Sequence, residues 1–464
     1  MQKHDNINNG IVHSLCFEKR HLMFKRKILA EMISWKRRSR GRSALLIQGA
    51  RRIGKSTTAE EFARREYKSY ILIDFSKARQ EVVRLFRDIS DLDFFFLQLQ
   101  LFYNVRLYER ESLIIFDEVQ LQPLARQAIK HLVADHRYDY LETGSLITLR
   151  KNIRDILIPS EEECLSMYPM DYEEFLWAKG DETTIPLLHE CFSRGRGLGD
   201  VVHRKQMQGF RLYMLIGGMP QSVESYLSTN NFNQIDQVKR NILTLYENDF
   251  RKIDHSGRAT QIFDAIPAEL SKNTFRYQVS KIIEKQRASN VREIIADLQD
   301  SMTVLPAFRI NDPGVGMSHY KDIDHFKLYL CDTGLFVTLA FKDRSFTENI
   351  IYEKLLHGKL PANLGYLYEN IVAQTFRAGG NELFYFTFPS DTSNRTYEID
   401  FLLPRKHKIC PIEVKSSGYK KHASLDRFRT KYRERIQESY VIYTKDYAPA
   451  DMLKYVPVYM AQFL

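Results

Sequence analysis

The chain has 464 residues, too many for one ordinary hydrophobic core, so its length predicts about three domains. Its formal net charge of +10 favours a polyanionic partner such as nucleic acid, although a basic surface can also serve solubility alone. Five scattered cysteines without a Cys-x-x-Cys pair argue against a zinc or disulfide framework, and the lack of a membrane-length apolar run or an apolar signal segment favours a cytoplasmic protein outside the membrane.

The first part of the chain alternates short apolar strands with helices. Residues 1–22 are predicted to be a polar extension, and a first helix is expected over Phe24–Trp35. Strands are expected at Ala44–Ile47, Tyr70–Asp74, Leu113–Phe116 and Tyr138–Thr143, with a helix at Ala125–Ala134. This alternation predicts an α/β fold with a parallel sheet over residues 23–170.

The middle of the chain changes character. Residues 171–260 show leucine and aromatic spacing near the helical period and are expected to be mostly helical. Within residues 261–350, a helix at Asn290–Ser301 precedes strands at Val304–Ile310 and Phe326–Leu330, which is the order of elements in a winged helix. Because that helix carries several acidic side chains, a structural or docking role is favoured over base reading.

A further α/β unit is predicted over residues 360–464. Helices are expected at Leu364–Ala378 and Ser424–Glu434. Strands are expected at Phe384–Phe388, Glu398–Leu403, Ile409–Val414 and Ser439–Thr444, the last of which is expected to end the chain's regular structure.

The run GARRIGKS has the pattern of a phosphate-binding loop, G-x-x-x-x-G-K-[ST]. It follows an apolar strand and precedes a helix, so backbone N–H groups and the helix N-terminus can hold phosphates. Lys55 can reach the β- and γ-phosphates, and Ser56 can bind Mg²⁺. The residues expected to bind ATP here are Gly49, Ala50, Arg51, Arg52, Ile53, Gly54, Lys55, Ser56 and Thr57.

A second apolar strand ends in Asp117 and Glu118, in the run LIIFDEVQ. Asp117 can hold Mg²⁺, and Glu118 can polarise the attacking water as a general base; two solvated acids in a loop are the alternative. The next strand ends in Thr143 and Ser145. Either hydroxyl could sense the γ-phosphate, although a simple turn explains both nearly as well. The sequence therefore predicts Mg²⁺-dependent binding and hydrolysis of ATP.

These motifs resemble those of prokaryotic AAA+ ATPases. The resemblance rests on the GARRxGKS loop, the FDE-x-Q strand end, and the runs Met167–Ala178, Leu215–Leu227 and Leu245–Ile253. It implies an ATPase core at 23–170, a helical lid at 171–260, a winged-helix-like segment at 261–350 and a restriction-endonuclease-like domain at 360–464. It also implies a homo-oligomer in which a neighbouring subunit supplies an arginine to the ATP site. Arg150 and Arg154 are candidates, but no local pattern singles out either.

The C-terminal unit carries a second set of charged residues, similar to the PD-(D/E)xK nuclease pattern. Asp400 lies in YEIDFLL, Glu413 and Lys415 lie in IEVKSS, and Glu369 lies on the preceding helix. Asp400 and Glu413 could hold Mg²⁺, while Lys415, on the same strand face as Glu413, could orient the nucleophile. Glu369 could hold the metal or its water. The alternatives are a solvated strand face, or a nuclease-like fold that only binds.

Six basic residues near this set would suit a phosphate backbone or could be ordinary surface: Lys406, Lys408, Lys420, Lys421, Arg427 and Arg429. Two functions therefore stay open. The first is an ATP-driven protein acting on nucleic acid, with DNA favoured, whose C-terminal domain cleaves or grips it. The second is a nucleotide-dependent oligomeric switch, for example in host defence, whose C-terminal domain is a silent binding module.

Overall fold

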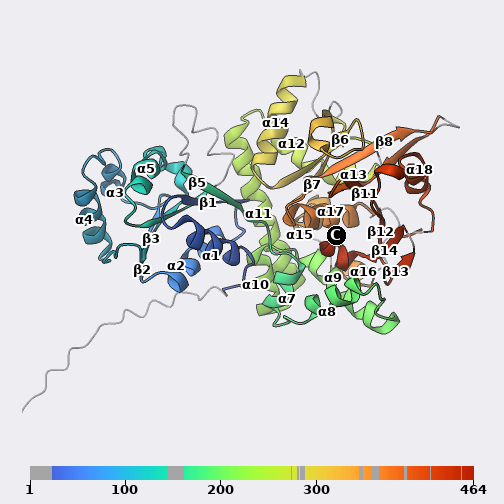
Figure 1. The fold of residues 1–464 in the computed structure, drawn as a ribbon, viewed down its shortest axis with the longest axis horizontal. Helices are drawn as coiled ribbons and strands as arrows, with labels where there is room; N and C mark the ends of the chain where they lie inside the picture. Colours follow the sequence, from blue (N-terminus) through green and yellow to red (C-terminus); the bar gives the residue numbers. More distant parts are fainter. Residues whose placement is uncertain are drawn as a thin grey trace, which may run out of the picture.

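Figure 1 shows a computed structural model in which one lobe carries the phosphate-binding loop and another carries the C-terminal strands. The long helix α11 (Phe232–Ile253) lies between them. The structure describes residues 23–144, 161–272, 274–279, 282, 288–343, 349–357, 365–390, 394–418, 420–450 and 452–464. The predicted extension at 1–22, together with Ser145, Arg150 and Arg154, lies outside these residues.

A parallel sheet forms the core of the P-loop lobe. Its strands are β1 (Ala44–Gln48), β2 (Ser69–Asp74), β3 (Ser112–Asp117), β4 (Asp139–Gly144) and β5 (Glu162–Ser166). They stand in the order β2-β3-β4-β1-β5. Asp74 is level with Asp117, and Gln48 with Gly144, so the carboxyl ends of the strands meet at one edge. The sequence did not predict β5, because its residues, EECLS, form no apolar run.

Helices cover this sheet: α1 (Ile28–Ser39), α2 (Lys55–Glu66), α3 (Gln80–Leu85), α4 (Leu92–Tyr103) and α5 (Pro123–Ala134). The predicted start of the first helix at Phe24 is wrong, since α1 begins at Ile28. The side chain of Arg26 instead binds backbone carbonyls of the P-loop lobe, which ties the residues before α1 to the loop.

The middle of the chain is mostly helical, in agreement with the expectation for residues 171–260. Its helices are α7 (Tyr172–Ala178), α8 (Thr184–Ser193), α9 (Asp200–Ile216), α10 (Pro220–Thr229), α11, α12 (Arg258–Asp264), α13 (Ile266–Ser271), α14 (Ala288–Asp300), α15 (Thr333–Ala340) and α16 (Asn349–Leu356). In the described part of the chain, no helix is both long and apolar enough to cross a bilayer.

The predicted helix–hairpin order is present as α14 followed by β6 (Val304–Ile310) and β7 (Lys321–Leu330), which pair antiparallel. However, β6 also pairs in parallel with β8 (Phe384–Pro389), which continues to β9 (Thr396–Ile399). The hairpin is therefore one half of a sheet in the order β7-β6-β8-β9, shared with the C-terminal unit.

The C-terminal lobe contains helices α17 (Gly365–Ala378) and α18 (Ala423–Lys431), with strands β10 (Phe401–Arg405), β11 (Lys408–Lys415), β12 (Ser439–Tyr443), β13 (Ala448–Ala450) and β14 (Leu453–Pro457). These strands form a mixed sheet in the order β10-β11-β12-β14-β13. The expectation that Ser439–Thr444 ends the regular structure is wrong, since β13 and β14 follow it.

The single strand predicted at Glu398–Leu403 is also wrong. The chain breaks at Asp400, so that β9 pairs with β8 while β10 pairs with β11 in the other sheet. The physical reason is a hydrogen bond between strands: the Asp400 carboxylate accepts from the Val414 backbone N–H at 2.7 Å. Asp400 thus marks the corner where the chain crosses between sheets.

Candidate functional site

The phosphate-binding loop joins β1 to α2 with a backbone that requires glycine at two positions. Gly54, with φ of 94°, immediately precedes Lys55, the first residue of α2. A Cβ on Gly49 would lie 2.4 Å from the Met167 carbonyl oxygen. Larger residues would therefore strain the loop or displace its neighbours. Ala50 and Ile53 are fully buried below the loop, so they offer phosphates their backbone only.

The Lys55 ammonium is folded back onto this loop. It donates hydrogen bonds to the Gly49 and Ala50 carbonyl oxygens, both at 2.9 Å. Burial lowers the pKa of Lys55 to about 8, although Glu118 and Asp117 oppose the shift. A phosphate group beside the ammonium would supply the negative charge that the buried lysine lacks.

Predicted residues from three elements meet at the sheet edge. The Ser56 hydroxyl donates to Asp117 Oδ1 at 2.6 Å, and the Thr143 hydroxyl donates to the same oxygen. The Thr143 oxygen also accepts from the Glu118 backbone N–H at 3.3 Å. Thr143 is fully buried, so it positions the two acids from beneath the site. The Ser56 hydroxyl and the Asp117 carboxylate are hard oxygen donors, which fit Mg²⁺.

Glu118 adopts an unusual backbone conformation for a residue with a side chain. Its φ is 55°, in the left-handed region, and its carboxylate accepts a hydrogen bond from the Gln120 side-chain amide. Such a conformation costs about 1–3 kcal/mol and is concentrated at functional sites. The strain is consistent with a carboxylate aimed by the surrounding structure rather than left to solvent.

A cavity of about 440 Å³ lies over the loop. Eight predicted residues line it: Arg51, Arg52, Gly54, Lys55, Ser56, Thr57, Asp117 and Glu118. Sequence reasoning missed further lining residues: Phe24, Arg26, Thr58, Asp74, Ser76, Lys77, Pro220, Gln221 and Glu224. Asp74 could have been found, because it ends an apolar strand in the same way as Asp117. Thr58, Ser76 and Lys77 lie next to the loop or to Asp74 in sequence, whereas Phe24, Arg26, Pro220, Gln221 and Glu224 come from distant segments and carry no local signal.

Arg26 fastens the loop from one side. Its guanidinium donates to the Ile53 carbonyl at 2.8 Å and to the Tyr168 carbonyl at 2.6 Å, and forms a buried ion pair with Glu174 at 3.1 Å. From the other side, α11 holds Arg51. The Tyr246 hydroxyl donates to the Arg51 carbonyl at 2.9 Å.

The C-terminal candidates also lie together. Lys415 Nζ is 2.6 Å from Glu413 Oε1 on the same face of β11. Burial, reinforced by the nearby Asp400 charge, raises the pKa of Glu413 to about 8. Glu369, on α17, is half-buried and interacts electrostatically with Asp400 and Lys415. The structure therefore gathers residues that the sequence separates by more than forty positions.

Three residues of this cluster were not predicted. Lys327 and Tyr329 come from β7 and Glu398 comes from β9. Lys327 Nζ lies 2.5 Å from Glu398 Oε1 and 3.9 Å from Glu369 Oε2, while the Tyr329 hydroxyl donates to Glu369 at 3.3 Å.

The cluster offers oxygen donors to a cation. Glu413 Oε2 and Glu398 Oε2 are buried and have no hydrogen-bond partner among the described residues. Such carboxylate oxygens fit Mg²⁺. Among those residues, however, no three His, Cys, Asp or Glu side chains converge in a geometry suited to a metal ion. Lys327 and Lys415 lie beside these carboxylates and already balance part of the negative charge that would attract a metal ion.

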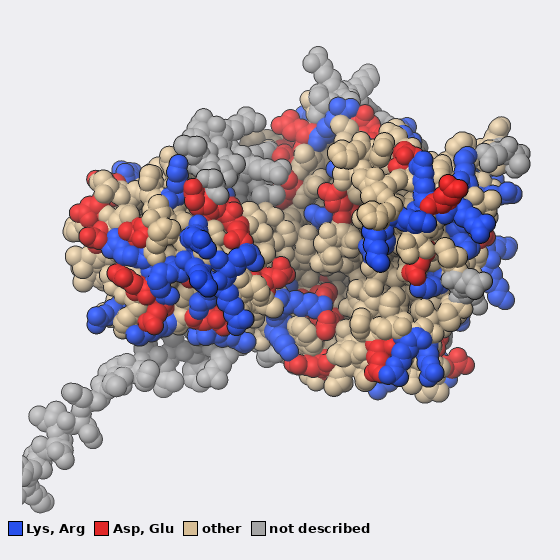
Figure 2. All heavy atoms as spheres, in the orientation of Figure 1, with Lys and Arg blue, Asp and Glu red and all other residues tan. Residues whose placement is uncertain are grey.

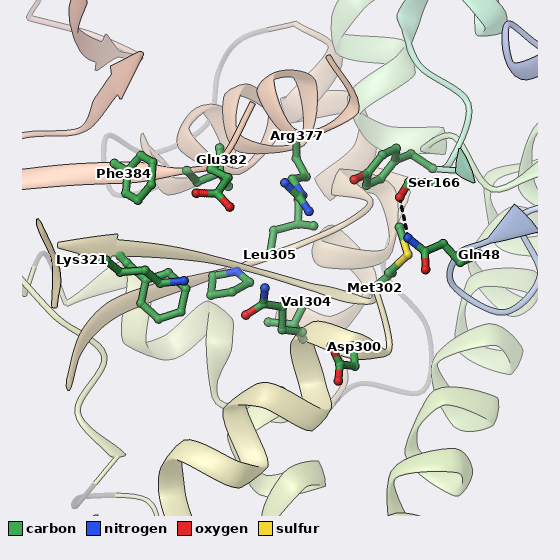
Figure 3. A pocket seen from close by; sticks show the side chains of 15 residues that line it. Gln48, Ser166, Asp300, Met302, Val304, Leu305, Lys321, Arg377, Glu382 and Phe384 are labelled. Atoms are coloured by element: carbon green, nitrogen blue, oxygen red, sulfur yellow. Dashed lines mark hydrogen bonds between the residues drawn. The ribbon is translucent and has the colours of Figure 1, made fainter. Parts of the chain in front are cut away.

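A second cavity, of about 200 Å³, lies where the lobes meet (Figure 3). Gln48 and Ser166 face it from the ends of β1 and β5, joined by a 3.0 Å hydrogen bond, while Arg377 and Lys321 face it from the C-terminal side. It holds no predicted site residue. Its position shows that the C-terminal side packs against the strand end that leads into the P-loop.

Buried hydrogen bonds connect the rim of the ATP cavity with α17. Asp332, two residues after the end of β7, accepts a hydrogen bond at 2.5 Å from the backbone N–H of Gly218, which lies two residues before Pro220. The next residue, Thr333, donates its N–H to Gln374 of α17 at 2.9 Å. The two candidate sites are therefore parts of one packed structure.

Basic side chains gather on the face shown in Figure 2, over the P-loop lobe and around the position of α18. Of the six basic residues singled out in the sequence, only Arg429 is half-buried; the other five are exposed.

Comparison with known proteins bears first on the part of the chain that contains the phosphate-binding loop. Residues 41–176 match the family model of an AAA domain. Residues 207–345 and 364–460 match two models described as domains of unknown function, DUF8612 and DUF4143. A comparison with curated proteins gives no match. Together with the loop geometry, the first match shows that the chain contains a P-loop nucleotide-binding domain of the AAA type.

Similar solved structures include the Walker-type ATPase PABY2304 of Pyrococcus abyssi, at 14% identity over 69% of this chain and 97% of that chain, with a TM-score of 0.43. The Orc1 protein of Aeropyrum pernix in complex with DNA is 12% identical over 72% and 93%, with a TM-score of 0.26. Cdc6p of Pyrobaculum aerophilum is 12% identical over 74% and 96%, with a TM-score of 0.24.

Proposed function

We propose that this protein binds and hydrolyses ATP and uses the nucleotide cycle to act on nucleic acid, with DNA favoured. One observation carries the ATPase part: Ser56, Asp117 and Thr143 share one hydrogen-bonded carboxylate at the edge of the 440 Å³ cavity, with Glu118 beside them. This arrangement places hydroxyl, carboxylate and ammonium groups around the space in which the loop would hold phosphates.

The chain's own residues divide the work of hydrolysis. The loop N–H groups and the start of α2 bind the phosphates, while Lys55 turns from the loop carbonyls to the β- and γ-phosphates. Ser56 and Asp117 would hold Mg²⁺, which would supply charge neutralisation. Glu118 polarises the attacking water and accepts its proton. Thr143 fixes the Asp117 carboxylate and the Glu118 backbone from below.

The C-terminal lobe is proposed to be a PD-(D/E)xK-like domain that cleaves or grips DNA. Asp400 and Glu413 would hold Mg²⁺, which would lower the pKa of a bound water. Lys415 would orient the nucleophile or stabilise developing charge, and Glu369 would support the metal or its water. Support comes from the shared position of these residues, of which Asp400 and Glu413 are buried and Glu369 and Lys415 half-buried, and from the exposed basic residues around α18.

A second function, a nucleotide-dependent switch with a silent C-terminal binding module, is favoured by one observation. Lys327 and Lys415 already pair with Glu398 and Glu413, which leaves the acidic cluster neutralised in part without a metal. In either function we propose a cytoplasmic homo-oligomer with ATP sites between subunits. Arg150 and Arg154 stay candidates for the arginine supplied by a neighbouring subunit.

The test follows phosphate release and DNA cutting in one reaction with Mg²⁺ and ATP, without DNA and with single- or double-stranded DNA. DNA-stimulated hydrolysis, with cutting lost in Asp400→Ala, would establish an ATP-coupled nuclease. A rate of phosphate release that is the same with and without each nucleic acid would refute action on DNA. Slow turnover with tightly retained nucleotide and no cutting would favour the switch.

A further inference from the structure

The acidic cluster of the C-terminal lobe is built from four carboxylates and two lysines. The carboxylates belong to Glu369, Glu398, Asp400 and Glu413, and the ammonium groups to Lys327 and Lys415. With every group ionised, two positive charges face four negative ones, so the cluster carries a formal charge of −2. This excess negative charge is equal in size to the charge of one divalent cation.

Lys327 differs from Lys415 in its origin and its surroundings. Lys415 belongs to the Glu-x-Lys pattern on β11, whereas Lys327 enters on β7, from the other sheet. Its side chain is only 8% exposed. Burial alone would lower the pKa of Lys327, but Glu398, Glu369 and Asp400 raise it well above its ordinary value, so the ammonium stays charged.

Its contacts show what the ammonium does. It pairs with Glu398 at 2.5 Å and approaches Glu369 at 3.9 Å, while the other Glu398 oxygen is buried without a partner among the described residues. Removing the ammonium would leave these half-buried acids without their cation, an arrangement that favours another cation.

We propose that Lys327 is the resident counter-ion of this carboxylate cluster and competes there with a divalent cation. The inference rests on the proposed metal-binding role of Asp400 and Glu413. Lys327 is thus a positioning residue: it holds Glu398 and Glu369 in the metal-free state, and its charge opposes a metal ion entering beside them. Neutralising Lys327 therefore strengthens divalent-cation binding.

The experiment measures Mn²⁺ binding to the full-length chain by titration calorimetry, without nucleotide. Mn²⁺ prefers the same oxygen donors as Mg²⁺. Lys327→Met, which keeps the apolar stem, is expected to lower the Kd by about tenfold or more, because one positive charge has been removed from the site. Lys327→Arg, which keeps the charge, should bind Mn²⁺ like the parent chain.

Two controls locate the effect. Lys321→Met removes a lysine from the same strand, where the ammonium lies over the Phe308 ring instead of the acids, and should leave the Kd unchanged. Asp400→Asn combined with Lys327→Met should abolish the gain. A second readout, the thermal midpoint, should rise more on Mn²⁺ addition in Lys327→Met than in the parent chain, since the metal replaces the missing charge.

The outcomes separate this inference from the proposed nuclease function. Binding in Lys327→Met but not in the parent chain supports the inference and refutes metal-dependent cleavage by the parent. Equal binding in the two chains overturns the inference and leaves the nuclease proposal standing. No binding in either chain overturns the inference, while the DNA-cutting assay decides the proposed function independently. If Lys327→Met does not fold, Lys327→Gln is measured against the same expectations.

Discussion

Replacing Arg26 with methionine is expected to destabilise the P-loop lobe by about 3–5 kcal/mol. The Arg26 guanidinium is buried, binds the Ile53 and Tyr168 carbonyls, and pairs with Glu174. Methionine preserves most of the apolar stem, so the loss is chiefly electrostatic. Because Ile53 belongs to the phosphate-binding loop, the same change should also weaken ATP binding.

The magnitude follows from what is left behind. Each hydrogen bond from a charged donor contributes about 1.5–3 kcal/mol, but the two are lost together with the ion pair and do not simply add. The dominant cost is Glu174, which is only 5% exposed and loses its cation. Removing one partner of such a buried pair typically costs about 3–5 kcal/mol.

The loss should depend on pH. Burial already raises the pKa of Glu174. Without Arg26, that pKa rises further, so the folded state binds the Glu174 proton more tightly than the unfolded chain does. This stabilisation is complete below the ordinary glutamate pKa and is lost as the pH rises through the folded pKa. The difference from the parent chain should therefore be smaller near pH ~5 than near pH ~8.

The chain offers a local probe for this test. Its two tryptophans are Trp35 in α1 and Trp177 in α7, the elements next to Arg26 and containing Glu174. Urea unfolding followed by tryptophan fluorescence should show the loss, and Arg26→Met combined with Glu174→Gln should recover part of it. A loss below about 1 kcal/mol, or no recovery in the double variant, would refute the reasoning.

Three further substitutions test the candidate sites. Lys55→Ala should abolish nucleotide binding in a calorimetric titration with ATP, since the Lys55 ammonium is the one that lies on the loop carbonyls in the described part of the chain. Glu118→Gln should leave ATP binding intact and lower phosphate release by about 10²-fold or more, the usual worth of a general base, and normal turnover would remove Glu118 from that role. Asp400→Ala should spare the ATPase rate and remove only Mg²⁺-dependent DNA cutting; cutting at the full rate would have to come from another site.

The ATP site was largely predictable because its chemistry is local in sequence. The loop, Lys55 and Ser56 are contiguous, and Asp117 ends an apolar strand. Parallel pairing then brings separate strand ends to one edge, which a strand–helix alternation already implies. What could not be predicted is the wall of the cavity formed by α10, because Pro220 reaches it through tertiary packing alone.

Asp400 was predicted to lie within a continuous strand, whereas the structure has it at a break between two strands. The apolar run around it favours one continuous strand, and nothing in the spacing marks a break. The break comes from a long-range hydrogen bond between the Asp400 carboxylate and the Val414 backbone, which competes with regular pairing. Strand propensity does not predict such a contact, because the contact depends on which strand packs beside Asp400 in the folded protein.

Lys327 carries a signal that the sequence does contain. It lies in FKLYL, a predicted strand whose residues are buried in the structure, and lysine is almost never buried unless it is paired. Lys327 and Tyr329, two positions apart, share one strand face, so that face must meet acceptors. The strand pattern thus predicts that carboxylates lie near β7, but it does not indicate which acidic residues they belong to. Only the pairing of β6 with β8 brings that face against Glu369 and Glu398, and makes the hairpin part of the C-terminal site.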